Sequence, residues 1–201
     1  MIRVLIAEDQ GMVRGALKAL LAMEGDIQIV AETDRADRIV PLALASRPEV
    51  ALLDIEMPGG DGITAAGLLR RELPSCKTLI LTTFGRPGFL RRAMESGVSG
   101  FMLKDAPAHE LALAIRRTMA GERVVDPGLA AAALSAGVSP LSDREREVLV
   151  AGKGGASIAE IAKALFLSEG TVRNYLSSAI QKLEVTNRTE AARVAEDLGW
   201  L

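Results

Sequence analysis

The sequence has little of several features that would mark particular classes of protein. It contains one cysteine, Cys76, and one histidine, His109. A single cysteine excludes an internal disulfide and a cysteine-rich zinc site, and it suits a reducing compartment. We interpret Cys76 as a small buried residue, because no histidine flanks it to act as a base. We expect His109 to face solvent on a helix.

Long hydrophobic runs are also missing. No segment approaches about 18 uninterrupted apolar residues, the length that favours a membrane-spanning helix. The first apolar run, over 4–7, is followed at once by Glu8 and Asp9, so it is too short for a signal peptide. These features predict a cytoplasmic protein without a membrane partner. Hydrophobic residues make up 49% and charged residues 25% of the chain, which predicts folded domains rather than disorder.

Short aliphatic runs alternate with amphipathic segments through residues 1–125. Such alternation is typical of a parallel sheet covered by helices on both faces. We therefore predict an α/β domain with a five-stranded parallel sheet. The expected strands are 4–7, 27–32, 50–54, 78–83 and 100–104, and the expected helices are 11–23, 35–46, 61–72, 86–96 and 107–120.

An alanine-rich stretch bracketed by Pro127 and Pro140 separates this half from the rest of the chain. We assign residues 1–122 to the first domain and 123–139 to a linker, which is either a tethered helix or a flexible segment. After the linker, the apolar residues recur only at the spacing of a helix. Residues 140–201 are therefore expected to form a small all-α domain of about four helices.

Helix-start signals support this all-α domain. Ser142 with Glu145 three residues later predicts a capping box, and Ser168 predicts a plain N-cap.

Polar side chains follow the ends of four expected strands. Because the carboxyl ends of parallel strands share one edge of a sheet, a ligand site is expected there. Carboxylates suit Mg²⁺, and a hydroxyl with a cation suits phosphoryl oxygens. Asp54 is best placed as a nucleophile, since it ends a central strand beside the expected metal ligands. The residues concerned are Glu8, Asp9, Asp54, Thr82 and Lys104.

Residues 1–125 resemble the response-regulator receiver family, through the motifs AED (7–9), LLDIEMPGGDG (52–62), LTT (81–83) and FMLKD (101–105). The resemblance implies a flavodoxin-like fold and a sensor histidine kinase as partner. It implies that Asp54 is the phospho-acceptor. It also implies Mg²⁺ ligation by Asp9, Asp54 and the backbone of Glu56, with Glu8 assisting through water. Thr82 would be the switch hydroxyl, Lys104 the phosphate-binding lysine, and Phe101 an aromatic whose rotamer changes on activation.

Residues 141–199 resemble the LuxR-type helix-turn-helix of NarL/FixJ-class regulators. The matching segments are LSDREREVL (141–149), EIAKALFLSEGTVRNYL (160–176) and the KLEV and NRTEAA segments of 182–192. The resemblance implies that a helix beginning near Glu169 lies in the DNA major groove. By position, Arg173, Asn174 and Ser177 are expected at base edges, and Thr171 and Lys182 near phosphates. The residues expected in the core are Ile158, Ile161, Ala162, Leu165, Val172 and Leu176.

The C-terminal domain lacks the basic excess of many DNA-binding domains. Residues 140–201 contain eight Lys and Arg and nine Asp and Glu. Affinity for phosphates must then come from the local placement of a few cations, and one monomer should bind weakly. We therefore expect a phosphorylation-dependent homodimer on double-stranded DNA. Two surfaces of the receiver could form this dimer: the segment 86–120, or the helices 11–23 and 107–120.

Two other functions use the same residues. One is a Mg²⁺-dependent phosphohydrolase with Asp54 as nucleophile, but the pocket lacks a second acid or base to hydrolyse the intermediate quickly. The other is a transcription factor with a vestigial receiver, which the complete set of pocket residues argues against. We predict a DNA-binding transcriptional response regulator and no enzyme.

Overall fold

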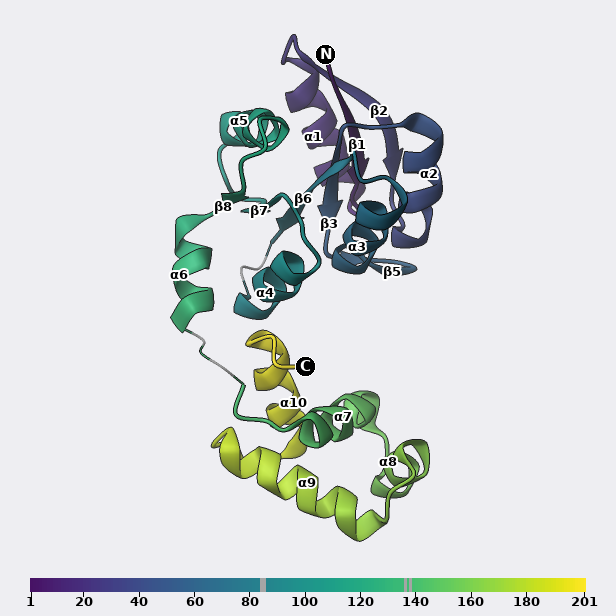
Figure 1. Cartoon of the computed structure of the whole chain (residues 1–201), viewed down its shortest axis with the longest axis vertical. Coiled ribbons are helices and arrows are strands. Elements are labelled where there is room, and N and C mark those ends of the chain that lie inside the picture. The colour runs from purple at the N-terminus through teal and green to yellow at the C-terminus, as the bar shows by residue number, and fades with distance from the viewer. Residues whose placement is uncertain (84–85, 136, 138) are drawn as a thin grey trace. The chain divides into compact units, whose positions relative to one another are not determined.

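The protein is described here by a computed structural model that covers residues 1–83, 86–135, 137 and 139–201. The chain forms two compact units. The main division falls between Ala130 and Ala131, and the short segment Arg86–Phe89 is grouped with the second unit. The N-terminal unit is a sheet covered by helices, and the C-terminal unit is helical (Figure 1). No described helix is both long enough and apolar enough to cross a bilayer.

The main sheet of the N-terminal unit is parallel throughout, in the order β2-β1-β3-β6-β7-β8. Five of its strands are the expected ones. The sixth, β8, arises in the segment assigned to the linker, because Val124 and Val125 pair with Gly100 and Phe101. The strands are β1 (Ile2–Ala7), β2 (Ile27–Thr33), β3 (Val50–Asp54), β6 (Lys77–Thr82), β7 (Gly100–Leu103) and β8 (Val124–Val125).

The expected helices are present with small shifts of their ends. The segment expected as one helix over 35–46 begins as a 3-10 turn, and the α-helix starts at Ile39. That start leaves Pro41 in the first turn, where its missing N–H is tolerated. The elements are α1 (Gly11–Ala22), η1 (Ala36–Arg38), α2 (Ile39–Ser46), α3 (Gly62–Glu72), α4 (Pro87–Glu95), α5 (Ala108–Met119) and α6 (Pro127–Ser135). The linker segment is thus helical over 127–135, and its residues 136 and 138 lie outside the described part.

Alternate residues of the strands pack on opposite faces of the sheet, as the two-residue period of a strand requires. Val4, Leu52, Leu79 and Met102 join one apolar cluster with residues of α1 and α5. The intervening residues, including the fully buried Leu5, Leu53, Ile80 and Phe101, face the other side. Figure 1 shows α1 and α5 on one side of the sheet and α2 and α3 on the other. Burial on both faces explains why the strands read as nearly continuous apolar runs.

The C-terminal unit contains four α-helices and a short 3-10 turn among its described residues. The capping box of Ser142 with Glu145 and the N-cap of Ser168 are confirmed. Ser157 and Glu160 form a second capping box that we did not anticipate. The elements are α7 (Asp143–Ala151), η2 (Lys153–Gly155), α8 (Ile158–Leu165), α9 (Glu169–Lys182) and α10 (Arg188–Asp197).

The expected interior residues of this unit lie in one apolar cluster. Ile161, Ala162, Val172 and Leu176 are buried, and Ile158 and Leu165 pack against them while partly exposed.

Two single residues of the N-terminal unit also agree with expectation. Cys76 is buried, and this burial raises the pKa of its thiol to about 12. His109 is exposed on α5.

Candidate functional site

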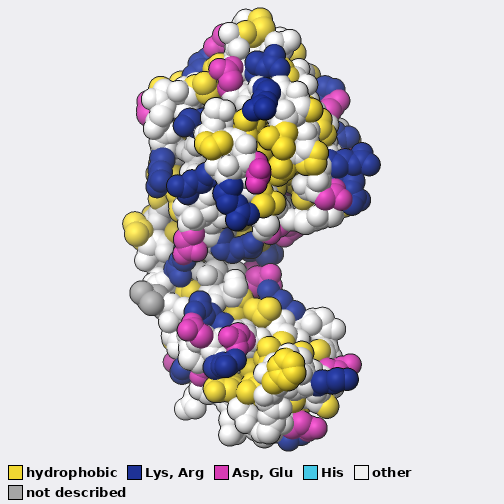
Figure 2. Space-filling view, turned by 45° about the vertical axis from the view of Figure 1, so that its right-hand side comes forward, with side chains coloured by type: hydrophobic (Ala, Val, Ile, Leu, Met, Phe, Trp, Pro, Cys, Tyr) yellow, Lys and Arg dark blue, Asp and Glu magenta, His cyan; other side chains and the backbone are white. Residues whose placement is uncertain are grey.

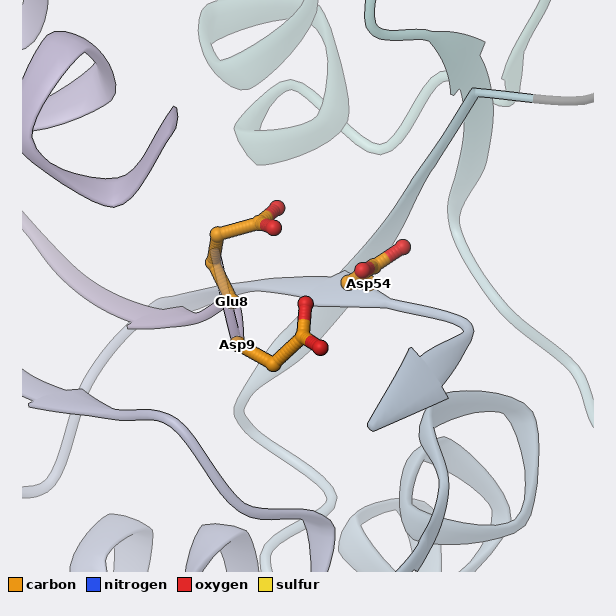
Figure 3. A group of neighbouring side chains, drawn as sticks. All are labelled: Glu8, Asp9 and Asp54. Atoms are coloured by element: carbon orange, nitrogen blue, oxygen red, sulfur yellow. The ribbon is translucent and has the colours of Figure 1, made fainter. Parts of the chain in front are cut away.

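Three carboxylates converge at the carboxyl edge of the sheet. Glu8 and Asp9 follow β1, and Asp54 ends β3. One ligand oxygen from each lies within 4.8 Å of the others, and Figure 3 shows the three groups around a common space. Glu8 and Asp54 are buried, whereas Asp9 is exposed. An all-oxygen donor set open to solvent on one side fits Mg²⁺, which keeps several of its waters.

Lys104 supplies the cation of this pocket. Its Nζ lies 2.7 Å from Glu8 Oε2 and 2.9 Å from Asp54 Oδ2. Burial opposes the charged ammonium, but the two ion pairs outweigh this and raise the pKa of Lys104. Burial also raises the pKa of Glu8, with a further contribution from the neighbouring charge of Asp54. Three carboxylates facing one ammonium leave an excess of negative charge, which favours a divalent cation.

Thr82 and Phe101 lie beside this pocket on neighbouring strands. Thr82 is the last residue of β6, where Leu81 pairs with Asp54. Phe101 pairs with Ile80, so Phe101 and Thr82 point to the same face of the sheet. Both side chains are buried, and Phe101 is fully so. The structure therefore places the expected switch hydroxyl and the expected switch aromatic on one face of the sheet, and a rotamer change of Phe101 stays a prediction.

A small hairpin follows Asp54. β4 (Glu56–Met57) and β5 (Gly60–Asp61) pair antiparallel around a turn in which Gly59 has a φ of +83°. The side chain of Glu56 is exposed, so its expected part in metal binding would be that of its backbone. The hairpin itself was not anticipated, since two-residue strands carry no periodic signal.

Gly62 is a residue of the pocket that sequence reasoning missed. Its N–H donates to Ile55 O at 2.9 Å, and a Cβ at this position would lie 1.8 Å from the backbone oxygen of Asp54. Only glycine allows this approach. The N–H of Ile55 in turn donates to Asp54 Oδ1 at 2.8 Å, which leaves Oδ2 facing Lys104. The signal in the sequence was the glycine that follows Asp61.

Helix α9 presents a polar face away from the apolar cluster. Val172, Leu176 and Ala179 are buried on one side, while Arg173, Asn174 and Ser177 are exposed on the other. Thr171 is the N3 residue: its N–H donates to Ser168 Oγ at 3.1 Å. Arg173 pairs with Glu169 one turn earlier at 2.7 Å, and both side chains are more than half exposed.

Lys182 differs from the other residues expected to contact DNA. Its Nζ lies 2.8 Å from Oε2 of Glu145, which is only 4% exposed. Burial would raise the pKa of Glu145, but hydrogen bonds from Lys182, Ser178 and the backbone of Ser142 outweigh it and lower the pKa to about 2. Sequence reasoning assigned Glu145 to the capping box alone and missed its contacts with α9.

Acidic and basic side chains are interspersed over the visible surface of the helical unit, as Figure 2 shows. Many of these side chains are also paired locally. Ion pairs between described residues of this unit include Arg144–Glu147, Arg146–Asp143, Lys153–Glu196, Arg173–Glu169, Lys182–Glu145 and Arg193–Asp197.

Comparison with known proteins agrees with both halves of this description. Residues 4–116 match the response regulator receiver domain, and residues 139–195 match the bacterial regulatory proteins of the luxR family. The transcriptional regulatory protein DesR of Bacillus subtilis is 45% identical over 200 residues, covering 100% of this chain and 99% of that protein. The DNA-binding transcriptional activator DevR/DosR of Mycobacterium tuberculosis is 34% identical over 208 residues, covering 98% and 95%.

Solved structures of response regulators are similar to this chain over nearly its whole length. A structure of RcsB dimers bound to DNA has a TM-score of 0.71 at 26% identity and covers 97% of this chain and 98% of that one. The response regulator ChrA of a heme-sensing two-component system has a TM-score of 0.61 at 35% identity and covers 100% and 98%. With a receiver domain followed by a luxR-family domain along its length, this chain belongs to the LuxR-type response regulators, a family of DNA-binding transcriptional regulators and not of enzymes.

Proposed function

We propose that a sensor histidine kinase phosphorylates Asp54 in a Mg²⁺-dependent reaction, and that phosphorylation promotes dimerisation and binding to double-stranded DNA. The observation that carries this proposal is the convergence of Glu8, Asp9 and Asp54 with the ammonium of Lys104 at one edge of the sheet. We assign residues 1–122 to the receiver, 123–139 to the linker and 140–201 to the DNA-binding domain.

Each pocket residue has a separate role in phosphoryl transfer. Asp54 Oδ1 is held by the amide of Ile55, so Oδ2 is the oxygen that attacks phosphorus. The bond between phosphorus and the donor nitrogen breaks, and that nitrogen takes up a proton. Asp9, Asp54 and the backbone of Glu56 would hold Mg²⁺, which would supply positive charge against the phosphoryl oxygens. Glu8 would assist through water.

Lys104 and Thr82 respond to the product. The phosphoryl group adds roughly 1.5 to 2 negative charges and three acceptor oxygens at Asp54. Lys104 already lies against Asp54 and can transfer its ion pair to the new oxygens. The hydroxyl of Thr82 reaches them only if the end of β6 moves inward, which gives Phe101 room to change its rotamer. The responding surface is therefore built from α4, β7 and α5.

The DNA-binding half supports an output through dimerisation. The exposed face of α9 is proposed to contact base edges through Arg173, Asn174 and Ser177. Thr171, in the first turn of α9, is proposed to lie near a phosphate. By resemblance to the same family, Lys182 is also expected near a phosphate. Because the unit has no basic excess, two copies on paired half-sites would bind far better than one.

The proposal is tested by treating the full chain with a small phosphodonor and Mg²⁺. We expect the sedimentation coefficient to shift from monomer to dimer in analytical ultracentrifugation, and a DNA footprint to appear under the same conditions. A phosphorylated monomer that gains DNA affinity would contradict the dimer step and point to the release of α9 from an inhibited state. A footprint that is independent of the phosphodonor would contradict phosphorylation as the switch.

A further inference from the structure

The buried carboxylate of Glu145 joins two helices of the DNA-binding unit. Its Oε1 accepts a hydrogen bond from Ser178 Oγ at 2.6 Å. Its Oε2 accepts from Lys182 Nζ at 2.8 Å and from the backbone N–H of Ser142 at 2.6 Å. Ser178 and Lys182 are one turn apart at the C-terminal end of α9, so one side chain of α7 holds this end of the recognition helix at two points.

This arrangement satisfies the carboxylate from three directions. A buried carboxylate is costly unless it is paired and hydrogen-bonded, and here both oxygens have donors. The apolar side chains around the α7–α9 contact include Val148, Leu149 and Ala179, all nearly inaccessible to solvent. Removing one of the three donors would leave charge buried without its partner, so the group acts as a unit.

The ion pair of Lys182 differs from that of Arg173 in what it leaves free for DNA. The side chain of Arg173 is 57% exposed and that of Glu169 is 51% exposed. Arg173 can therefore readily exchange Glu169 for a phosphate or a base. The side chain of Lys182 is 39% exposed, but its partner Glu145 is only 4% exposed. Glu145 would lose its counter-ion if the ammonium moved to a phosphate. Lys182 is also the last residue of α9, where a cation is favoured by the helix dipole alone.

We propose that Glu145 is a positioning residue for the recognition helix, and that Lys182 is its internal counter-ion rather than a phosphate ligand. This inference rests on the proposed use of α9 in DNA binding and revises the part assigned to Lys182. Glu145 holds the register of α9 against α7, and so sets the angle at which Arg173, Asn174 and Ser177 are presented to DNA. A buried charged group whose partners specify one arrangement of two helices has precedent as a physical device.

The test measures the salt dependence of binding by the full chain to a short mixed-sequence duplex. Each phosphate contact contributes about one unit to the slope of log K against log salt. On a mixed-sequence duplex Arg173 has no specific base to read, and its exposed guanidinium is expected to pair with phosphate instead. Arg173→Gln is therefore the positive control and should lower the slope by about one unit. We expect Lys182→Gln to weaken binding without lowering the slope, because its ammonium does not release a DNA counter-ion. A slope lowered by about one unit in Lys182→Gln would overturn the proposal.

A second measurement, of the Tm, separates a loss of DNA contacts from a loss of stability. Lys182→Gln alone should lower the Tm by about 4–8 °C, the shift for roughly 1 kcal/mol in a domain of this size. The double variant Glu145→Gln/Lys182→Gln should recover part of the Tm and of the DNA affinity, since no buried charge remains. The matched exposed pair, in Glu169→Gln/Arg173→Gln, should show no such rescue of the Tm.

Absence of rescue in the Glu145/Lys182 cycle would overturn the proposal. If Arg173→Gln left the salt slope unchanged, the assignment of α9 to DNA would be wrong instead, and the thermal cycle would still decide whether Glu145 and Lys182 act as a pair.

Discussion

Each of the two units buries a carboxylate against a lysine, but the ratio of carboxylates to hydrogen-bond donors differs between them. In the receiver, Lys104 faces Glu8 and Asp54 with Asp9 nearby, and burial raises the pKa of Glu8. In the helical unit, Lys182 and two further donors surround the single carboxylate of Glu145, whose pKa is about 2. A pocket with more carboxylates than cations can bind a further cation and a phosphoryl group. A carboxylate whose two oxygens both accept hydrogen bonds instead stabilises the packing of two helices, and we call Glu145 the framework carboxylate.

The largest effect is expected at the pocket with surplus charge. Asp54→Asn removes the nucleophilic carboxylate but keeps the size of the side chain, so phosphorylation by a small phosphodonor with Mg²⁺ should be abolished. Intact-mass spectrometry should show the added phosphoryl group in the wild type only. Asp34→Asn, at an exposed residue outside the pocket, is the control and should be phosphorylated normally. A phosphoryl group that remains in Asp54→Asn would place the acceptor elsewhere.

The framework carboxylate should matter most for stability. Glu145→Ala leaves the hydroxyl of Ser178 and the partly exposed ammonium of Lys182 without their shared partner, so we expect a loss of about 1–3 kcal/mol in the free energy of unfolding. Glu147→Ala removes a half-exposed partner of Arg144 on the same helix and should cost less than about 1 kcal/mol. Urea denaturation followed by circular dichroism measures both. Equal losses in the two variants would contradict the contrast between them.

Acid should weaken the framework carboxylate in a defined window. The pKa of Glu145 is about 2 in the folded protein against an ordinary value of 4.5, so its contribution is complete above pH 4.5 and is lost as the pH falls toward 2. The shift corresponds to at most about 3 kcal/mol. The stability difference between wild type and Glu145→Gln should therefore shrink on acidification across this window. A difference that stays constant from neutral pH to pH 2 would show that the carboxylate is not specially stabilised.

Mg²⁺ should stabilise the pocket and leave the framework pair unaffected. A ligand at about 100 times its Kd adds roughly 2.7 kcal/mol to the native state, which differential scanning calorimetry would record as a higher Tm. Asp9→Asn removes the exposed ligand and should weaken this response, while Glu145→Gln should retain it. If Asp9→Asn responded like the wild type, the ion would be bound by other groups.

The smallest effect concerns one exposed contact of α9. Arg173→Ala should cost about 1–3 kcal/mol on a specific site and relax discrimination at one base pair, if the guanidinium reads a base. Binding titrations on an operator and on single-base variants would measure it. Unchanged discrimination would mean that a different face of α9 meets the bases.

Much of the fold and the receiver pocket was predictable because the signals are local. Strand periods, the capping box of Ser142, and the polar residues after each strand can be read without knowing distant contacts, and parallel strands bring their ends together. The strand β8 was missed because two residues between a helix and Pro127 show no periodicity. Gly62 was missed because only the fold shows that its Cα lies against the backbone of Asp54.

The sequence by itself determined the α/β unit, the helical unit, and the set of side chains at the edge of the sheet, since these follow from periodicity and from where strands end. Only the tertiary structure decided what each charged group faces. Glu145 meets Ser178 and Lys182, which are 33 and 37 residues away, because the packing of α7 on α9 brings them together. No local pattern encodes such a pairing, and it is the pairing that separates a lysine prepared for a phosphoryl group from one that holds a helix in place.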